Sequence, residues 1–232
     1  MSGGAIIVGA GSGLSAALAR RLASEGYRIT LAARDTAKLA TLAAETGART
    51  VAMDGSDAAA MAELFAAEPE PPRVAIYNPS ARLRGPIGEL DPDAVRRAID
   101  VTAFGAFLMG REAARAMAEA PIVEGRRGVI LFTGASAGEK GFANSAPFAM
   151  GKFAQRGLAQ SMARELHPKA IHVAWVNIDG GIANPTRADR TDDGTDTMLD
   201  PDAIAAAYLN IIAQPRSAWS NELTLRPWQE PF

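Results

Sequence analysis

The sequence predicts one α/β domain, a parallel sheet of about seven strands with helices on both faces. Three observations lead to this fold class. Short apolar runs alternate along the chain with longer, alanine-rich runs of helical character. The apolar runs are continuous, as expected of parallel strands that are covered on both faces. The 232 residues contain neither an internal repeat nor a linker, so residues 1–232 are interpreted as a single domain.

The expected strands are apolar runs ended by glycine, proline or polar residues. In chain order they are Ala5–Val8, Arg28–Ala32, a weaker Thr50–Ala52, Val74–Tyr77, Gly128–Phe132, Ile171–Val176 and Glu222–Leu225.

The expected helices lie between these strands and carry recognisable start and stop signals. Glycines end the first two, proline favours a start at Pro92, and Pro168 ends the longest. They are Leu14–Glu25, Thr36–Thr46, Asp57 to about Glu68, Pro92 to about Glu119 with a break, Ser145–Leu166 and Ala203–Ile212. The long polar segment of about 180–199 is predicted to be a lid over the substrate site.

Composition narrows the classes of partner. The net charge is −2, the pI is about 5.8, and no block of lysine or arginine stands out. We therefore expect a small-molecule substrate and neither nucleic acid nor membrane as a partner. The chain has no cysteine, which excludes disulfides and thiolate metal sites and fits a cytoplasmic location. Its two histidines, His167 and His172, have no metal-ligand spacing, so no metal is expected.

The start of the chain predicts neither export nor membrane insertion. No charged leader precedes a long apolar run in MSGGAIIVGAGSG. No apolar run reaches the roughly 18 residues that a membrane-spanning helix needs.

The first predicted strand runs into a glycine-rich turn that opens a helix. Glycine lets the backbone approach a diphosphate closely, and a helix N-terminus supplies free N–H groups and partial positive charge. A strand, a glycine turn and a helix in this order indicate a Rossmann-type dinucleotide site. The residues assigned to it are Gly9, Gly11, Ser12, Gly13 and Leu14.

The second strand ends at Arg34 and Asp35, where a dinucleotide fold meets the adenosine ribose. An arginine accommodates a 2′-phosphate, whereas a carboxylate binds the 2′-hydroxyl. Arg34 comes first, so we favour NADP over NAD. Asp35 is either a ligand of the ribose 2′-hydroxyl, which would favour NAD, or a cap of the next helix. Asp54, after the third strand, is either an adenine contact or a turn residue.

Five stretches together resemble the short-chain dehydrogenase/reductase family over nearly the whole chain. The glycine turn carries Gly9 and Gly13, and Tyr77-Asn78-Pro79-Ser80 resembles the family's Asn-Asn-Ala-Gly motif. GVILFTGASAG resembles the strand and loop of the catalytic serine, and FAMGKFAQRGLAQSMAREL resembles the Tyr-x-x-x-Lys helix. IHVAWVNIDGGI resembles the segment that holds the nicotinamide. The resemblance implies cofactor contacts by Asn78, Lys152, Gly180 and Ile182.

The catalytic positions depart from the family pattern. Phe148 stands where the family has its tyrosine and has no hydroxyl with which to handle a proton. Ala135 stands in the place of the serine with Ser136 beside it, and Thr102 stands in the place of a helix asparagine. Lys152 remains, one helical turn after Phe148 and on the same face. The resemblance therefore implies Lys152 and Ser136 as catalytic candidates.

Three functions remain open at this point. The first is an NADP(H)-dependent oxidoreductase acting on an unknown small carbonyl or alcohol by a rewired proton path. Its proton would come from Ser136, a water held by Lys152 or the substrate. The second is a non-catalytic NADP-binding or sensor protein. The third is a non-redox lyase or isomerase with Glu139 or Asp179 as its base.

The substrate pocket is expected beyond the carboxyl ends of the strands. Ala135, Phe142 and Phe148 are its predicted residues, with Ile182 and the lid alongside. Asp189, Asp192, Asp193 and Asp196 make the lid acidic, so they either repel anionic substrates or lie in solvent. Small residues on the helices around 103–117 and 148–163 favour close helix packing, and the resemblance implies a homodimer or homotetramer through them.

Overall fold

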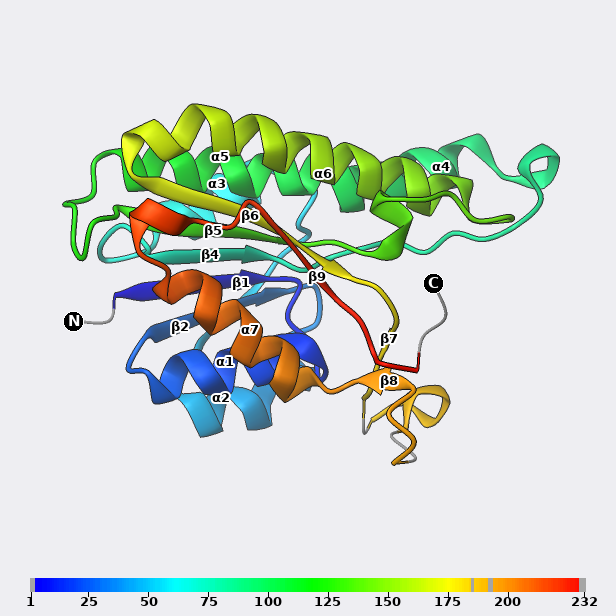
Figure 1. Cartoon of the computed structure of the whole chain (residues 1–232), viewed down its shortest axis with the longest axis horizontal. Helices are drawn as coiled ribbons and strands as arrows, with labels where there is room; N and C mark the ends of the chain where they lie inside the picture. Colours follow the sequence, from blue (N-terminus) through cyan, green and yellow to red (C-terminus); the bar gives the residue numbers. More distant parts are fainter. Residues whose placement is uncertain (1–2, 185, 192–193, 230–232) are drawn as a thin grey trace.

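The computed structural model describes residues 3–184, 186–191 and 194–229. Its central sheet has seven parallel strands in the order β3-β2-β1-β4-β5-β6-β9 (Figure 1). The strands are β1 Gly4–Val8, β2 Arg28–Ala33, β3 Arg49–Ala52, β4 Val74–Tyr77, β5 Gly128–Thr133, β6 Ile171–Ile178 and β9 Glu222–Leu225. The predicted doubly wound parallel sheet is confirmed, and each predicted strand overlaps an observed one.

Helices cover both faces of this sheet. On one side lie α1 Leu14–Ser24, α2 Ala40–Thr46 and α7 Pro201–Ala213, and on the other α3 Ala58–Ala66, α4 Pro92–Ile99, α5 Gly105–Ala118 and α6 Ala146–Leu166 (Figure 1). Two separate apolar cores result, one on each face of the sheet. All eight residues of β6 are buried because helices cover both of its faces. Within the described residues, the helices are too short or too polar to cross a lipid bilayer.

Local side chains set several helix boundaries. Asp57 caps α3 and Asp91 caps α4, each by accepting hydrogen bonds from backbone N–H groups of the first turn. Asp200 caps α7 in the same way, so α7 begins at Pro201, two residues earlier than predicted. The predicted helix over 36–46 opens instead as a 3₁₀ turn, Ala37–Leu39, before α2.

The predicted break between Pro92 and Glu119 is a π-helical segment, Asp100–Phe104. It lies where Gly105 packs against the hydroxyl of Tyr77, a contact that leaves no room for a Cβ atom. The Tyr77 hydroxyl donates to the carbonyl of Val101. Tertiary contact with β4 therefore accompanies the change of helical pitch.

The segment predicted to be a lid contains a small second sheet. Its strands, β7 Gly181–Ile182 and β8 Met198–Leu199, were not predicted. Pro185, Asp192 and Asp193 of this segment lie outside the described residues.

Candidate functional site

Two adjoining cavities lie at the carboxyl ends of the central strands. Their volumes are about 580 and 510 Å³. They share part of their lining, namely Gly9, Gly11, Ser12, Asn78 and Ser80. Every residue predicted to bind a cofactor lines at least one of them: Gly9, Gly11, Ser12, Gly13, Leu14, Arg34, Asp54, Asn78, Lys152, Gly180 and Ile182.

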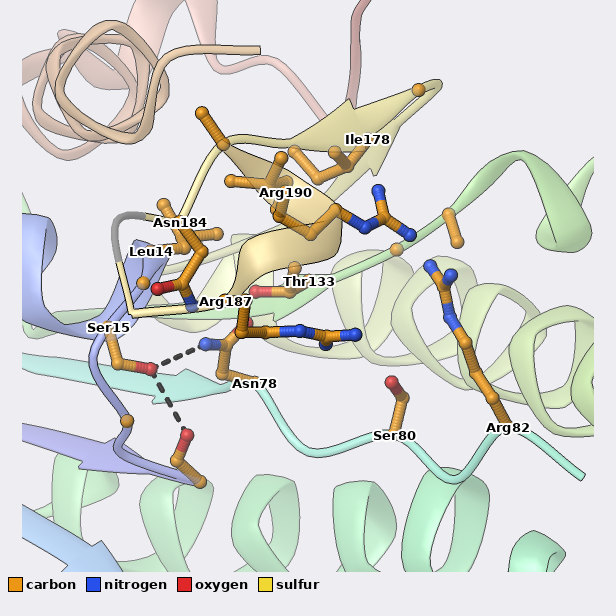
Figure 2. A pocket seen from close by; sticks show the side chains of 18 of the residues that line it. Leu14, Ser15, Asn78, Ser80, Arg82, Thr133, Ile178, Asn184, Arg187 and Arg190 are labelled. Atoms are coloured by element: carbon orange, nitrogen blue, oxygen red, sulfur yellow. Dashed lines mark hydrogen bonds between the residues drawn. The ribbon is translucent and has the colours of Figure 1, made fainter. Parts of the chain in front are cut away.

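The glycine turn after β1 is held tightly against the chain after β4. Gly9 has a φ of +81°, and a Cβ atom there would lie 2.6 Å from Cγ of Pro79, so only glycine fits. The Ser15 hydroxyl donates to the Gly9 carbonyl (3.1 Å) and accepts from the Asn78 amide (2.5 Å) (Figure 2). Gly13 precedes α1 without a side-chain cap. The N-terminus of α1 is thus open to an anion in the cleft.

The second cavity carries two cations at its rim, Arg34 and Lys38. The carboxylate of Asp35 already has two partners. It forms an ion pair with Lys38 (3.0 Å) and accepts a hydrogen bond from the backbone N–H of Ala37 (3.2 Å). The hydrogen bond from Lys38 lowers the pKa of Asp35. Asp54 accepts from the Ser56 hydroxyl (2.7 Å), which lowers the pKa of Asp54 together with the nearby charge of Arg34.

Lys152 is buried at the inner wall of the first cavity, with 2% of its surface exposed. Its ammonium donates to the Thr133 carbonyl (2.6 Å) and to Oε1 of Gln155 (3.2 Å). Burial, followed by the charge of Arg82, lowers the pKa of Lys152 to about 7.

A chain of buried polar groups continues from Lys152 to the π-helical segment. The Gln155 amide donates to the Thr102 carbonyl (3.3 Å), and the Thr102 hydroxyl accepts from the backbone N–H of Ala81 (3.1 Å). Thr102 is fully buried and does not line the cavity. It ties the loop after β4 to the helix layer, and Gln155, which the sequence reasoning missed, orients Lys152.

The remaining predicted pocket residues separate into two groups. Ala135 and Phe148 line the first cavity. Phe142 is 48% exposed and lies outside the lining, with Lys140 near its ring. Ser136 also lies outside the lining, because a 3₁₀ turn over Ser136–Gly138 directs it to Asp179.

The two acids considered as bases are engaged elsewhere. Asp179 accepts from Nε of Arg226 (3.0 Å), and hydrogen bonds from Arg226 and Ser136 lower its pKa despite burial, which acts in the opposite direction. Glu139 lies 3.9 Å from Arg156. Neither acid lines the cavity in the described part of the chain, so neither faces the site where a base would act.

Three arginines that sequence reasoning missed line the cavity, namely Arg82, Arg187 and Arg190. The guanidinium carbon of Arg82 lies 4.9 Å from the centroid of the Phe148 ring. Arg187 and Arg190 belong to the predicted lid. A hydrogen bond between the hydroxyls of Thr186 in the lid and Ser12 in the glycine turn (2.7 Å) joins these two segments.

The chain is similar to known proteins over most of its length. A family model described as short chain dehydrogenase matches residues 4–193. A crystallised short-chain dehydrogenase from Rhodopseudomonas palustris is 34% identical, with 97% of this chain and 99% of that chain covered and a TM-score of 0.83. A metagenomic short-chain oxidoreductase in complex with NADP is 27% identical, with 97% of each chain covered and a TM-score of 0.81. An uncharacterized oxidoreductase of Staphylococcus saprophyticus is 26% identical, with 96% of each chain covered.

Proposed function

The chain belongs to the short-chain dehydrogenase/reductase family of oxidoreductases, and from this premise we propose that it is an NADP(H)-dependent enzyme interconverting a small carbonyl compound and its alcohol. The observation that carries the proposal is the pair of adjoining cavities at the carboxyl ends of the strands, which together are lined by the glycine turn, Arg34, Lys38 and Lys152. A comparable relative was crystallised with NADP.

The residues of the cleft fit this cofactor. The uncapped N-terminus of α1 suits a diphosphate, and Lys152 suits ribose hydroxyls. Arg34 and Lys38 suit a 2′-phosphate, while Asp35 is already paired with Lys38. When bound, NADPH supplies the hydride.

The proton path must differ from that of a tyrosine enzyme. Phe148 cannot donate, and Ser136 is turned toward Asp179. Among the described residues that line the first cavity, Lys152 is the one with a pKa near 7. We assign it, directly or through a water, the role of passing a proton to the developing alkoxide.

Substituting Arg34 by glutamine tests the cofactor assignment. We expect Arg34→Gln to weaken NADPH binding by roughly 10- to 100-fold through loss of charge-assisted hydrogen bonds, and to leave NADH binding nearly unchanged. The measurement is quenching of protein fluorescence by each nucleotide. Arg21→Gln, at an exposed position on α1, is the matched control. Equal affinity of the unaltered protein for NADPH and NADH would contradict the preference, and binding of neither would end the proposal.

We also propose a homodimer or homotetramer. Four large apolar side chains are 42–53% exposed on α5, α6 and the π-helical segment before α5: Phe104, Phe107, Met150 and Phe153. Such side chains are typical of surfaces that pack against another copy. We expect light scattering to give the mass of two or four chains, and Phe107→Ser with Phe153→Ser to reduce it. A monomer at tens of micromolar would refute this assembly.

A further inference from the structure

The first cavity has an unusual balance of charge. The described residues that line it include four cationic side chains, Arg82, Lys152, Arg187 and Arg190, and no aspartate or glutamate. The chain as a whole has a net charge of −2, so this concentration is local. A cavity lined by one sign of charge attracts ligands of the opposite sign.

The features suited to cofactor phosphates do not account for Arg82. Those features are the glycine turn with the N-terminus of α1 and, in the second cavity, Arg34 with Lys38. Arg82 lies at the other end of the first cavity, away from Ser15 and Asn78 (Figure 2). Its guanidinium group lies over the ring of Phe148. The carbonyl substrate is expected to bind beside this ring.

Backbone hydrogen bonds hold Arg82 in this place. On one side of it, the N–H of Ala81 donates to the Thr102 hydroxyl (3.1 Å). On the other side, the N–H of Gly85 donates to the Asn144 carbonyl (3.0 Å). The loop is therefore fixed both to the π-helical segment and to the residues just before α6.

The lid brings two more guanidinium groups to the same end of the cavity (Figure 2). A closed turn fixes them, because the N–H of Asn184 donates to the Arg190 carbonyl (2.8 Å) and the N–H of Arg190 donates to the Arg187 carbonyl (2.9 Å). Asp189 balances Arg187 through two hydrogen bonds of 2.7 and 3.1 Å and lies 3.8 Å from Arg190.

Arg82 has no carboxylate partner among the described residues. Partial burial, then the charges of Arg190, Arg84 and Arg187, lowers its pKa. Like charges held close together are unfavourable, and an anion bound at Arg82 would relieve this repulsion. Among the described residues of the lid, Arg187 and Arg190 line the cavity and Asp189 and Asp196 do not.

We propose that the substrate carries an anionic group, a carboxylate or a phosphate, that Arg82 and Arg190 bind beside Phe148. This inference rests on the proposed function, because it names the class of carbonyl compound that the same site accepts. A guanidinium fork matches both anions, so the two kinds of substrate share one recognition chemistry.

The test compares charged and neutral members of matched pairs. The probes are acetoacetate with its methyl ester, 2-oxobutanoate with its methyl ester, and dihydroxyacetone phosphate with dihydroxyacetone. Calorimetry measures the binding of each probe to the protein saturated with NADP⁺, so that the result does not depend on turnover. We expect the anionic member of at least one pair to bind roughly tenfold more tightly or better. The pair that shows the larger preference identifies carboxylate or phosphate.

Arg82→Gln should remove most of this preference and leave the affinity for NADPH within about twofold, since a neutral amide cannot replace the charge. Arg84→Gln is the matched control, because Arg84 belongs to the same loop and does not line the cavity. Equal binding of charged and neutral probes, or an unchanged preference in Arg82→Gln, would overturn the inference while NADPH binding still supported the proposed function. An equal loss of NADPH affinity in Arg82→Gln would assign this arginine to the cofactor and overturn it too.

Discussion

Replacement of Phe148 by tyrosine is expected to raise the rate of carbonyl reduction by roughly 10²- to 10⁴-fold, the usual contribution of a positioned general acid. Phe148 lines the first cavity and precedes Lys152 by one helical turn of α6. The substitution adds one hydroxyl at the edge of a half-buried ring. It introduces a hydroxyl that can donate a proton at position 148, where phenylalanine has none.

Two basic side chains near position 148 would lower the pKa of a phenol placed there. The ammonium of Lys152 lies on the same face of α6, and the guanidinium of Arg82 lies 4.9 Å from the ring centroid. Nearby positive charge lowers the pKa of a phenol and so brings its proton closer to transfer at neutral pH. The expected gain is therefore largest in a step that waits for protonation of the alkoxide.

Single-turnover oxidation of bound NADPH, followed by absorbance with saturating carbonyl substrate, measures this rate. Phe142→Tyr is the matched control, because Phe142 precedes α6, is exposed and lies outside the cavity. The affinity for NADPH should be the same in both variants. If Phe148→Tyr binds NADPH normally and gains no rate, then proton supply does not limit the reaction and the proposed path through Lys152 must be revised.

The strands of the central sheet could be predicted from sequence because their signal is local. A parallel strand buried on both faces reads as an uninterrupted apolar run, as in Gly4–Val8 and Val74–Tyr77. Helix starts were harder to place, since they depend on single hydrogen bonds. The carboxylate of Asp200, for example, starts α7 at Pro201 by accepting from the backbone N–H of Asp202.

Features set by contacts distant in sequence could not be predicted in this way. The π-helical segment accompanies the packing of Gly105 on Tyr77, which is 28 residues away by their numbers (105 − 77). The strands β7 and β8 pair across a polar stretch whose composition is typical of a loop. The hydrophobic periodicity of these segments predicts neither the π-helical geometry nor the pairing of β7 with β8.

The candidate site shows the same division between local and distant determinants. The glycine turn, Arg34 and Lys152 belong to motifs with fixed spacing, so their placement at one cleft was expected. The direction of a long side chain on a loop is decided by packing, which the sequence does not show. The lid has more aspartates than arginines, so its overall charge did not indicate that Arg187 and Arg190 line the cavity. Ser136 failed to reach the cavity because a 3₁₀ turn faces it toward Asp179.

Substitution of Lys152 by methionine is expected to have two large and opposite effects. The first is on the cofactor: loss of a charged donor to the ribose should weaken NADPH binding by roughly 10- to 100-fold. The second is on stability, because methionine can occupy a buried site without the cost of placing an ammonium there.

The sign of the stability effect follows from the pKa. Lysine has a pKa of 10.5 when exposed, and burial lowers that of Lys152 to about 7. Between these values the unfolded chain holds the proton and the folded protein does not, so the stability of the unaltered protein rises with pH. The rise is about 1 kcal/mol for each pH unit across this window, and below pH 7 the cost of the buried charge is present in full. Lys152→Met lacks this rise, so it should gain most in stability, relative to the unaltered protein, below pH 7.

Chemical denaturation without nucleotide at pH 6.5 and pH 9 measures the difference. Lys140→Met, at an exposed position outside the cavity, is the control and should keep the pH dependence of the unaltered protein. Parallel dependences in the unaltered protein and Lys152→Met would show that Lys152 does not titrate in this range.

The titration of Lys152 should also be detectable as proton uptake when NADPH binds. At pH 8 the ammonium of Lys152 has mostly lost its proton, and contact with the anionic nucleotide favours the charged form. Binding of NADPH should therefore take up close to one proton, which calorimetry in two buffers of different ionisation enthalpy detects. Uptake should vanish in Lys152→Met and persist in Lys140→Met. Proton uptake that survives in Lys152→Met would have to come from another group, and Lys152 would then lose its assignment as the proton-carrying residue of the site.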